Sequence, residues 1–387
     1  MSGGKWSSFQ AVPDDVLFFR DGKPSSIGAD HYLRSLFPPN PATLYGALRT
    51  RRLMDGGVEL GGLGEATWRE RLGALEAELG PWGGFGSLEL RGPWLVKDGV
   101  PLLPAPADLG LIFEKSSHAG PPRIAEVFRF RPVEAEGDGR WSHPLALLAP
   151  FAADGERWIS AASDREPRPA SGWFLTPAGL SAWRAGGVPA PGDFVHASDL
   201  WRDEPRTGIG LQSGQRSGKD GMLYTFGFVR LLPGVALGFE VTGSELETAG
   251  RVKLGGEGRT AMLEPGPAFP AAQETAKSER FCLYFVTPAL SESGGYPPGF
   301  SAGRLDGELA GRSCRLTAAV LPGFSTAGGW DVANASPKPL RRAIPAGSVF
   351  LFEGAPDLIR ELDGTCLSGF PDLARQGFGL AVTGISR

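Results

Sequence analysis

The chain has 387 residues, of which 41% are hydrophobic and 21% charged, a composition typical of a globular protein. Its 57 glycines and 34 prolines follow no repeating period, which excludes a collagen-like fibre and indicates a loop-rich fold of two or three domains. With 39 basic and 43 acidic residues the net charge is −4, so the chain as a whole lacks the positive excess of a free-standing nucleic-acid binder.

The cysteines, histidines and N-terminus exclude several further classes. Cys282, Cys314 and Cys366 lie far apart, which suits free thiols in a reducing compartment, and the four histidines form no HExxH pattern. We therefore expect no structural metal and no cofactor. The N-terminus has no apolar signal region, and no stretch approaches about 18 apolar residues. These features predict a cytoplasmic protein that does not bind membranes.

The first elements in the chain are a strand and two helices. The first element is residues 6–22, whose alternating and then continuous apolar residues, Val16 to Phe19, read as a buried strand that ends at the Asp21-Gly22 turn. A basic amphipathic helix follows from Thr43 to Met54, with Thr43 as its N-cap and Gly56-Gly57 as its stop. Residues 65–79 carry apolar side chains at helical spacing and predict a second amphipathic helix.

The middle of the chain is less regular. Residues from about 83 to 205 are proline-rich, and we interpret them as a long insertion of loops and short strands, one pair joined by an Asp98-Gly99 hairpin turn. Residues 221–243 contain two alternating apolar runs around Pro233-Gly234, which predicts a hairpin. Residues 250–263 resemble another strand with a glycine-rich approach.

A second set of elements follows a Pro/Ala-rich stretch. Strands are predicted within 280–290, 314–324 and 347–353, a short helix at 356–362 and a final strand within 377–385. The order β, β, β, α, β leaves open whether a helix follows the first strand, and it suits a ferredoxin-like domain or a variant. The β-then-α start of the chain allows the same fold with large insertions.

Three catalytic patterns nearly match and fail. Residues 214–220 (GQRSGKD) are one residue short of a phosphate loop, and residues 208–214 (GIGLQSG) have Ser213 where the dinucleotide pattern needs its third glycine. Residues 299–303 (GFSAG) satisfy G-x-S-x-G but lack the strand before and the helix after. No histidine follows them, because the last one is His196. The sequence therefore argues against a nucleotide loop and a serine hydrolase.

A metal-independent ribonuclease is harder to exclude. Such an enzyme needs a general base near a 2′-hydroxyl and cations around the developing phosphorane charge. His31, beside Tyr32 and Arg34, is a candidate base, although a loop histidine with ordinary hydrogen bonds fits the sequence better.

Three basic clusters lie on or beside glycine-rich segments. Each cluster alone is equally well interpreted as solvated surface. Together the clusters favour a protein that binds a polyanion, because arginine and nearby backbone N–H groups bind phosphates. Single-stranded RNA would add base stacking on Tyr45, Tyr224 or Phe378, each of which also fits a core position. The clusters are Arg49, Arg51 and Arg52; Arg206, Arg216 and Lys219; and Lys338, Arg341 and Arg342.

Seven ordered blocks carry a family resemblance: DVLFFRDGKP, FPPNPATLYGALR, GMLYTFGFVRL, LGGEGR, GYPPGF, AIPAGSVFLFE and RQGFGLAVTG. In this order they resemble the third subunit of the type III-B CRISPR effector (the Cmr complex), within the RAMP superfamily of RNA-binding proteins. The match covers both ends and is weakest between about 83 and 205.

The resemblance implies an α+β fold with two ferredoxin-like (RRM-like) domains, at 1–265 with an insertion at about 83–205, and at 276–387. It implies a non-catalytic subunit that binds the 5′ tag of the CRISPR RNA (crRNA). It also implies docking on the large palm-domain subunit and on a backbone RAMP subunit, in antiviral defence. A RAMP endoribonuclease that processes repeat RNA and a protein-interaction module without RNA contact are the alternatives.

By the resemblance, Gln376, Gly377, Phe378 and Gly379 form the glycine-rich RNA-facing loop, and Thr43, Tyr45 and Arg49 lie at the tag. Residues 206–224 look like a loop or thumb laid across the guide. Together with the basic clusters, the expected RNA-binding residues are Arg20, Lys23, His31, Thr43, Tyr45, Arg49, Arg52, Arg206, Arg216, Lys219, Tyr224, Arg259, Lys338, Arg341, Arg342, Gln376, Gly377, Phe378 and Gly379.

Overall fold

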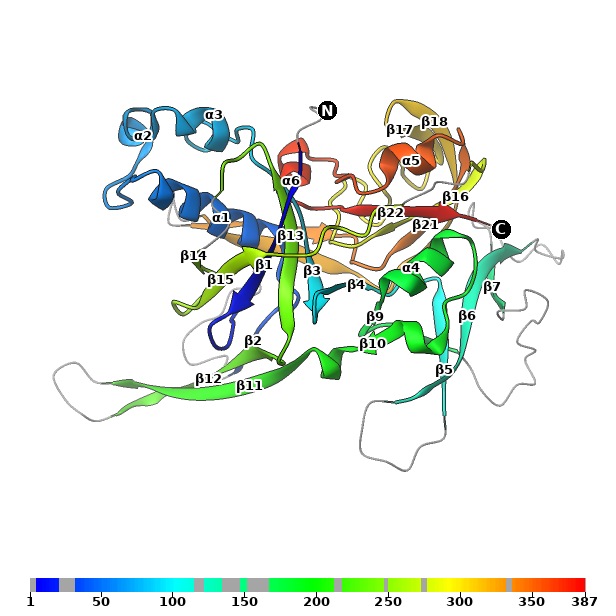
Figure 1. Cartoon of the computed structure of the whole chain (residues 1–387), viewed down its shortest axis with the longest axis horizontal. Helices are drawn as coiled ribbons and strands as arrows, with labels where there is room; N and C mark the ends of the chain where they lie inside the picture. The colour runs from blue at the N-terminus through cyan, green and yellow to red at the C-terminus, as the bar shows by residue number, and fades with distance from the viewer. Residues whose placement is uncertain are drawn as a thin grey trace. The chain divides into compact units, whose positions relative to one another are not determined.

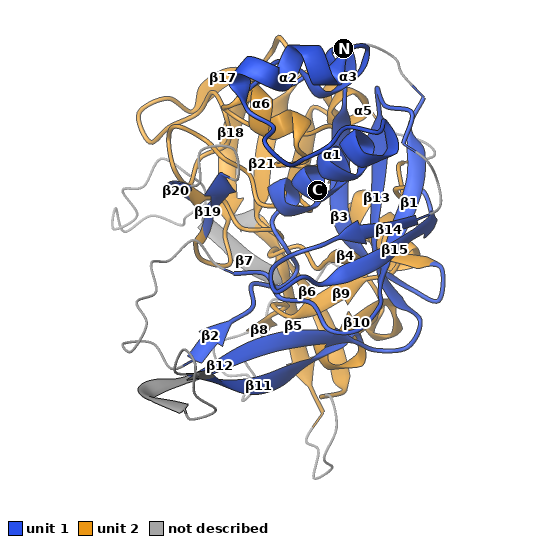
Figure 2. Cartoon of the chain, turned by 90° about the vertical axis from the view of Figure 1, so that its left-hand side faces the viewer, with its two compact units in different colours: residues 1–99, 200–268, 326–341 blue, residues 100–199, 269–325, 342–387 orange. Residues whose placement is uncertain are grey.

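The computed structural model describes residues 5–20, 32–114, 122–133, 147–151, 167–211, 218–246, 250–272, 277–331 and 336–386. The fold is mixed α and β and rich in strands (Figure 1). Two compact units interleave along the chain (Figure 2). Unit 1 contains Met1–Gly99, Leu200–Ala268 and Thr326–Arg341, and unit 2 contains Val100–Asp199, Phe269–Ser325 and Arg342–Arg387.

The described residues of unit 1 form three helices and several sheets. Its elements are β1 (Ser7–Pro13), β2 (Tyr32–Arg34), α1 (Pro41–Asp55), α2 (Glu65–Leu72), α3 (Leu75–Leu79), β3 (Glu89–Lys97), β11 (Trp201–Leu211), β12 (Gly218–Leu231), β13 (Val235–Thr242), β14 (Gly250–Lys253), β15 (Thr260–Pro265) and most of β19 (Ser325–Asp331) and β20 (Ser336–Ala343).

The main sheet of unit 1 runs in the order β3-β13-β1-β15-β14, with every neighbouring pair antiparallel. β13 is an inner strand, paired with β3 on one side and β1 on the other, and all eight of its residues are buried. Helix α1 contacts β3 and β14 and buries Leu44, Tyr45 and Leu48. The core of the unit therefore lies between this helix and the sheet, because each supplies one apolar face.

The first predicted helix is confirmed with shifted ends. Helix α1 begins at Pro41 and Asn40 is its N-cap, so the expectation of Thr43 as N-cap was wrong. Proline is favoured at the first helical position because its fixed φ suits the helix and its missing N–H would have no helical partner. The helix ends at Asp55, before Gly56 as expected.

The second predicted helix is two helices. Gly73 has a φ of +51°, outside the right-handed helical region, and it separates α2 from α3. The apolar spacing of residues 65–79 continues across the break, because Trp68, Leu72 and Leu79 are all buried. The periodicity thus identified the buried face correctly but not the interruption.

Three strand predictions in unit 1 need correction. Residues 16–19 are buried but form only an isolated bridge, Leu17 to Val229, and the first strand is β1. The two runs around Pro233-Gly234 are strands but not a hairpin, because β12 pairs with β11 and β2 whereas β13 pairs with β1 and β3. Residues 250–263 form two paired strands, β14 and β15, rather than one.

Unit 2 holds the rest of the chain. Its elements are β4 (Val100–Pro104), β5 (Leu109–Phe113), β6 (Ile124–Val133), β7 (Leu147–Phe151), β8 (Arg168–Pro169), β9 (Trp173–Leu175), α4 (Pro177–Arg184), η1 (Pro191–Asp193), β10 (Phe194–His196), η2 (Ala197–Asp199), β16 (Arg280–Phe285), β17 (Asp306–Leu309), β18 (Arg312–Val320), β21 (Val349–Gly354), α5 (Leu358–Leu362), α6 (Pro371–Arg375) and β22 (Ala381–Ile385).

The largest sheet of unit 2 runs β17-β18-β21-β16-β22 and is antiparallel throughout. The strands predicted within 280–290, 314–324, 347–353 and 377–385 are confirmed, and so is the short helix, α5. No helix lies between β16 and β17, a segment that the structure describes completely. Phe281, Phe350 and Phe352 lie at the centre of the core.

A buried polar cluster explains why much of the expected insertion packs with the C-terminal strands. The Arg129 guanidinium pairs with Asp108 at 2.8 Å and donates to the Trp183 carbonyl at 2.7 Å and to the Cys282 sulfur at 3.2 Å. Burial raises the pKa of the Cys282 thiol to about 12. These contacts link residues 100–199 to β16 within unit 2, and the boundaries 1–265 and 276–387 stay a prediction.

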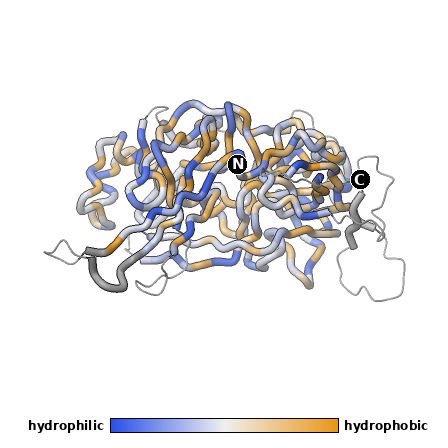
Figure 3. The backbone as a smooth tube through the Cα atoms, turned by 90° about the horizontal axis from the view of Figure 1, so that it is seen from below, coloured by the Kyte–Doolittle hydropathy of each residue, from blue (hydrophilic) through white to orange (hydrophobic). Residues whose placement is uncertain are grey.

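Hydrophobic and hydrophilic residues interleave along the chain (Figure 3). Among the residues that the structure describes, no helix is long and apolar enough to span a membrane.

Candidate nucleic-acid interface

The most prominent surface element of unit 1 is the ribbon formed by β11 and β12, with β2 added in parallel along β12 (Figure 1). Side chains alternate between its two faces. On one face Phe226 and Phe228 pack against Phe18, with ring centroids 5.0 and 5.5 Å apart, and Leu33 packs against the same cluster. This small apolar cluster fixes the ribbon to the rest of its unit.

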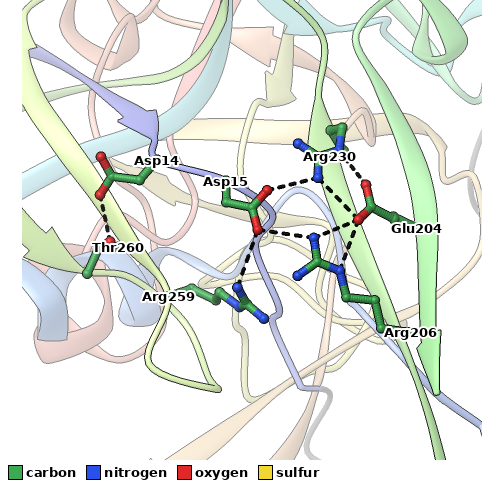
Figure 4. A network of polar contacts seen from close by, with 7 residues as sticks. All are labelled: Asp14, Asp15, Glu204, Arg206, Arg230, Arg259 and Thr260. Atoms are coloured by element: carbon green, nitrogen blue, oxygen red, sulfur yellow. Dashed lines mark hydrogen bonds and ion pairs between the residues drawn. The ribbon is translucent and has the colours of Figure 1, made fainter. Parts of the chain in front are cut away.

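An ion network lies beside the cluster (Figure 4). Asp15 accepts hydrogen bonds from Arg230 at 2.8 Å and from Arg206 at 3.1 Å. Glu204 accepts from the same two arginines, at 3.1 Å from Arg230 and 2.7 Å from Arg206. Arg259 reaches Asp15 at 3.4 Å and lies over the Phe228 ring, 4.6 Å from its centroid. The base of the ribbon is thus held to the N-terminal segment by charge as well as by packing.

The network keeps its carboxylates ionised. Hydrogen bonds from Arg230 and Arg206 lower the pKa of Glu204 from an ordinary 4.5 to about 2. Desolvation opposes ionisation of Asp15, but the hydrogen bonds from Arg230 and Arg206 outweigh it and hold the pKa of that carboxyl below its usual 3.8. Two carboxylates therefore face three arginines, and the group carries one positive charge in excess at neutral pH.

Farther along the ribbon, aromatic side chains reach solvent. Tyr32 is 43% exposed and Tyr224 38% exposed. The Tyr224 ring lies directly over Gly208, where a Cβ atom would come within 2.5 Å of it. The Arg34 guanidinium lies 5.7 Å from the centre of the Tyr32 ring. Exposed rings flanked by cations are what single-stranded nucleic acid needs for base stacking and phosphate contact.

The start of helix α1 lies next to the base of the ribbon. Phe37 contacts Trp201, the first residue of β11, with centroids 4.9 Å apart, and also Phe19. No acidic residue occurs in the first turn of α1, and the Asn40 side chain caps no N–H group. The Thr43 N–H already donates to the Asn40 carbonyl at 3.0 Å, but the partial positive charge of this helix end faces no acidic side chain of its own first turn and is available to an anion.

A glycine-rich turn packs on the same segment. The Gly256 N–H donates to the Phe18 carbonyl at 2.8 Å. Gly255 has a φ of +85°, and a Cβ there would lie 2.4 Å from the Phe18 carbonyl oxygen. Only glycine fits so close to another backbone. Four of the sequence blocks quoted above thus meet in one region of unit 1.

Arg49 is the most unusual cation of this region. Its guanidinium lies over the rings of Trp68 and Phe85, at 5.2 and 5.9 Å from their centroids. Its Nε is buried without a hydrogen-bond partner, and among the described residues no carboxylate pairs with it. Burial lowers the pKa of Arg49 below its usual value. Aromatic rings attract a cation but do not neutralise it, so this charge is well placed to accept a phosphate.

The other two arginines of the helix are engaged within the chain. The Arg52 Nε pairs with Glu78 at 2.9 Å, and the side chain is only 14% exposed. Arg51 pairs with Asp55 and donates to the Arg251 carbonyl at 3.0 Å. The cluster expected to face a polyanion therefore divides into one unneutralised cation and two structural pairs.

Several expected RNA contacts lie in the core instead. Tyr45 is 2% exposed, and its hydroxyl donates to the Leu88 carbonyl at 3.3 Å. Gln376 through Gly379 are all buried: the Gln376 amide donates to the Asp372 carbonyl at 2.9 Å, and Phe378 is 2% exposed. Stacking on Tyr45 or Phe378 and an RNA-facing loop at 376–379 do not fit this burial. The pattern of apolar and polar residues in the sequence could not show whether an aromatic side chain such as Tyr45 or Phe378 lies in the core or on the surface.

The remaining expected residues are placed as follows. Lys338, Arg341 and Arg342 are exposed on β20, Arg20 is exposed, and Thr43 is half-buried in the first turn of α1. Lys23, His31 and Arg216 lie outside the described residues, as does the side chain of Lys219.

Asp15, Glu204 and Arg230 were not expected from sequence. Glu204 and Arg206 are two residues apart on one strand, so the spacing that puts both on one face was available as a signal. Their partner Asp15 lies 191 residues from Arg206 and could not be found locally. No group of three histidine, cysteine or acidic residues in the described part of the chain is arranged to hold a metal ion.

Comparison with known proteins gives one family. Residues 9–386 match the model of the family described as CRISPR-associated protein (Cas_Cmr3). No curated protein matches the sequence at a significant level.

Solved structures resemble the chain more distantly. A chain from a cryo-EM structure of type III-B Cmr-beta bound to cognate target RNA and AMPPnP is 14% identical, with 92% of this chain and 88% of that chain covered and a TM-score of 0.48. A chain of the Csm3-Csm4 subcomplex of a type III-A CRISPR-Cas interference complex is 11% identical, with 90% and 94% covered and a TM-score of 0.36. At these values the structural likenesses support no assignment by themselves.

Proposed function

Because the chain belongs to the family of CRISPR-associated Cmr3 proteins, and so to the subunits of type III-B (Cmr) effector complexes, we propose that it holds the 5′ tag of the crRNA. In this role it is a non-catalytic scaffold that bridges the large palm-domain subunit and a backbone RAMP subunit. The family match is the premise, and the residues of unit 1 supply the physical argument.

Strand order supports two ferredoxin-like domains. Numbered along the chain, β1, β3, β13 and β15 lie in the order 4-1-3-2 in the first sheet, and β16, β18, β21 and β22 lie in the same order in the second. The first sheet has a helix, α1, after its first strand, and the second has helices α5 and α6 after its third. Each sheet thus carries one helical connection of the ferredoxin-like βαββαβ pattern.

The observation that carries the proposal is the unneutralised, partly buried charge of Arg49. A cation that has lost hydration and gains no carboxylate is costly to the free protein. A phosphate of the bound tag would supply the missing anion and a charge-assisted hydrogen bond. The open N-terminus of α1 would bind a second phosphate in the same way.

The β11–β12 ribbon supplies the rest of the interface. Its ion network fixes the base, so that Tyr32, Arg34 and Tyr224 face solvent on a rigid support. Bases of a single strand would stack on the tyrosines. Arg20, Lys23, Thr43, Arg206, Arg216, Lys219 and Arg259 remain part of the proposed phosphate-binding surface, and the alternative ribonuclease would use His31.

The test is purification of the chain with the products of its neighbouring genes, followed by sequencing of co-purified RNA and ultraviolet crosslinking. We expect short RNAs that share a repeat-derived 5′ end, with adducts on the ribbon of this chain. Partners without RNA would instead favour a protein-interaction module. Loss of repeat-RNA cleavage on His31→Ala substitution would favour the ribonuclease.

A matched pair of variants tests the site itself. Arg49→Glu should weaken binding of tagged RNA by the purified complex about tenfold, because it replaces an attraction with a repulsion. Arg69→Glu is the control, since Arg69 lies one helix away and is 88% exposed. Equal affinity of the two variants would remove Arg49 from the interface.

A further inference from the structure

A second ribbon, formed by β19 and β20, is inserted along the chain at a point equivalent to that of the β11–β12 ribbon. The chain makes β11 and β12 between β3 and β13, the second and third strands of the first sheet. It makes β19 and β20 between β18 and β21, the second and third strands of the other sheet. Both ribbons are therefore extensions of equivalent connections.

Large apolar side chains on and beside β19 and β20 face solvent. Phe324, just before β19, is 69% exposed, Trp330 within β19 is 58% exposed and Leu340 within β20 is 48% exposed. Every residue from Pro337 to Arg342 is exposed. Exposed aromatic residues gathered on one short element indicate a binding surface, because each leaves apolar area in water.

The charges around these rings are mostly positive. Lys338, Arg341 and Arg342 lie on β20, and Asp331 is the acidic residue of the two strands. The Arg342 guanidinium lies 5.2 Å from the centre of the Phe324 ring, so a cation covers that ring from one side. The Lys338 side chain passes the backbone of Gly329, the neighbour of Trp330. A basic side chain thus lies close to each of the two exposed aromatic residues. This local positive charge contrasts with the net charge of −4 of the whole chain.

Two prolines of β20 limit the hydrogen bonds that its backbone can donate to a partner. Pro337 and Pro339 are two residues apart on β20, so both point their backbone nitrogens to the same edge. Proline has no N–H to donate, so the edge of β20 that these two nitrogens face offers a partner strand fewer hydrogen bonds. The side chains of the ribbon are therefore the better candidates for binding, and rings beside cations fit bases and phosphates better than an apolar protein surface.

We propose that the β19–β20 ribbon is a second contact for single-stranded RNA, in which Trp330 and Phe324 stack on bases while Lys338 and Arg342 bind phosphates. This inference rests on the proposed RNA-binding function, and it adds the aromatic residues of the β19–β20 ribbon to the proposed RNA contacts. Both ribbons would then bind single-stranded RNA.

The test uses the full chain in its purified complex, stripped of co-purified RNA, and fluorescein-labelled oligouridine as the probe. Trp330→Ala should raise the Kd about fivefold, the lower end of what one stacked base contributes. Trp330→Phe should restore most of the affinity, because phenylalanine still presents a flat ring. Lys338→Glu should weaken binding more at low salt than at high salt.

Matched controls separate this proposal from the function on which it rests. Met54→Ala removes a comparably exposed apolar side chain (56%) from α1, and Lys277→Glu reverses an exposed lysine that belongs to neither ribbon. Ultraviolet crosslinking of the unmodified complex should place an adduct on Trp330. Normal RNA affinity of Trp330→Ala and Lys338→Glu, while Tyr224→Ala loses affinity, would overturn the second contact and leave the first.

Two other outcomes would also overturn the proposal. Loss of a protein subunit from the Trp330→Ala complex with unchanged RNA affinity would identify the ribbon as a protein-docking surface. An unmodified complex that binds neither oligouridine nor cellular RNA would remove the proposed function and this contact together.

Discussion

At the scale of single residues, pairing decides which cations are free to bind RNA. Arg52 looks as suitable as Arg49 in the sequence, but it already faces the Glu78 carboxylate. Arg49 instead lies between aromatic rings with its Nε unpartnered. A site that is costly to the free protein and useful to the complex often shows such a local conflict.

The substitution Arg49→Met separates the effect of Arg49 on the stability of the chain from its effect on RNA binding. Methionine is unbranched, fills the space between the two rings and carries no charge, so the melting temperature of the chain should stay the same or rise. Binding of RNA with the repeat-derived 5′ end should weaken about tenfold, because a charge-assisted contact is lost. Differential scanning fluorimetry and fluorescence anisotropy measure the two quantities. A lower melting temperature with unchanged affinity would mean that Arg49 is structural.

The ion network predicts a pH dependence for the ribbon. The pKa of Glu204 is about 2 in the folded chain and an ordinary 4.5 in the unfolded chain. A lowered pKa contributes stability that is present above about 4.5 and is lost as the pH falls towards 2.

Glu204→Gln removes this contribution. At neutral pH the variant should melt below the unmodified chain, and the gap should close as the pH falls from 4.5 towards 2. Thermal melts of both proteins across that window give the difference. A gap that persists at the acid end would assign the effect to packing rather than to charge.

At the scale of elements, glycines fix the close approaches that shape both units. Gly379 has a φ of +73°, and a Cβ there would lie 1.8 Å from the Leu367 carbonyl oxygen. Gly57, after helix α1, has the same φ but nothing within 4 Å. Gly379 therefore serves the close packing of its backbone against Leu367, just before β22, which gives this glycine a structural role.

The two positions form a matched pair. Gly57→Ala should cost about 1 kcal/mol, the backbone strain of a left-handed conformation. Gly379→Ala should cost at least about 2 kcal/mol more, because the backbone of residue 367 must also move. Melting temperatures of the two variants make the comparison. Similar melting temperatures would show that the loop adjusts easily and is free to contact RNA.

At the scale of the whole molecule, charge limits what the chain does alone. The net charge is −4, and most arginines of unit 1 whose contacts are described face carboxylates of the same chain. A net negative charge gives RNA no overall attraction to the chain, so the proposed RNA binding would rely on a few local contacts. We infer that neighbouring subunits supply much of the electrostatic attraction.

Salt dependence tests this inference. For single strands, log Kobs falls with log salt by about 0.7 for each phosphate contact. The isolated chain should give a shallow slope, worth about two or three contacts, and the complete complex a much steeper one. Titrations with one labelled RNA at several salt concentrations provide both slopes. Equal slopes would place the main phosphate contacts on this chain.

Local patterns in the sequence predicted many elements correctly. Helix α1, the C-terminal strands and α5 follow from apolar spacing bounded by glycine and proline, because such signals act over a few residues. The ordered blocks identified the family, which the match over residues 9–386 confirms. The break at Gly73 was missed because a glycine inside a helical pattern is often tolerated.

The sequence by itself determined the family, the mixed α and β composition and the position of several elements, among them α1, α5 and the strands of the C-terminal sheet. Only the tertiary structure decided which strands pair and which charges are neutralised. Arg206 and Arg230 form hydrogen bonds with Asp15, which lies 191 and 215 residues away in the sequence. Strand β13 pairs with β1 and β3 and not with β12, the strand that precedes it in the chain. Such contacts depend on how distant segments fold together, so no local pattern encodes them. That is why Arg49 emerges as the unpaired cation of its helix only once the fold is known.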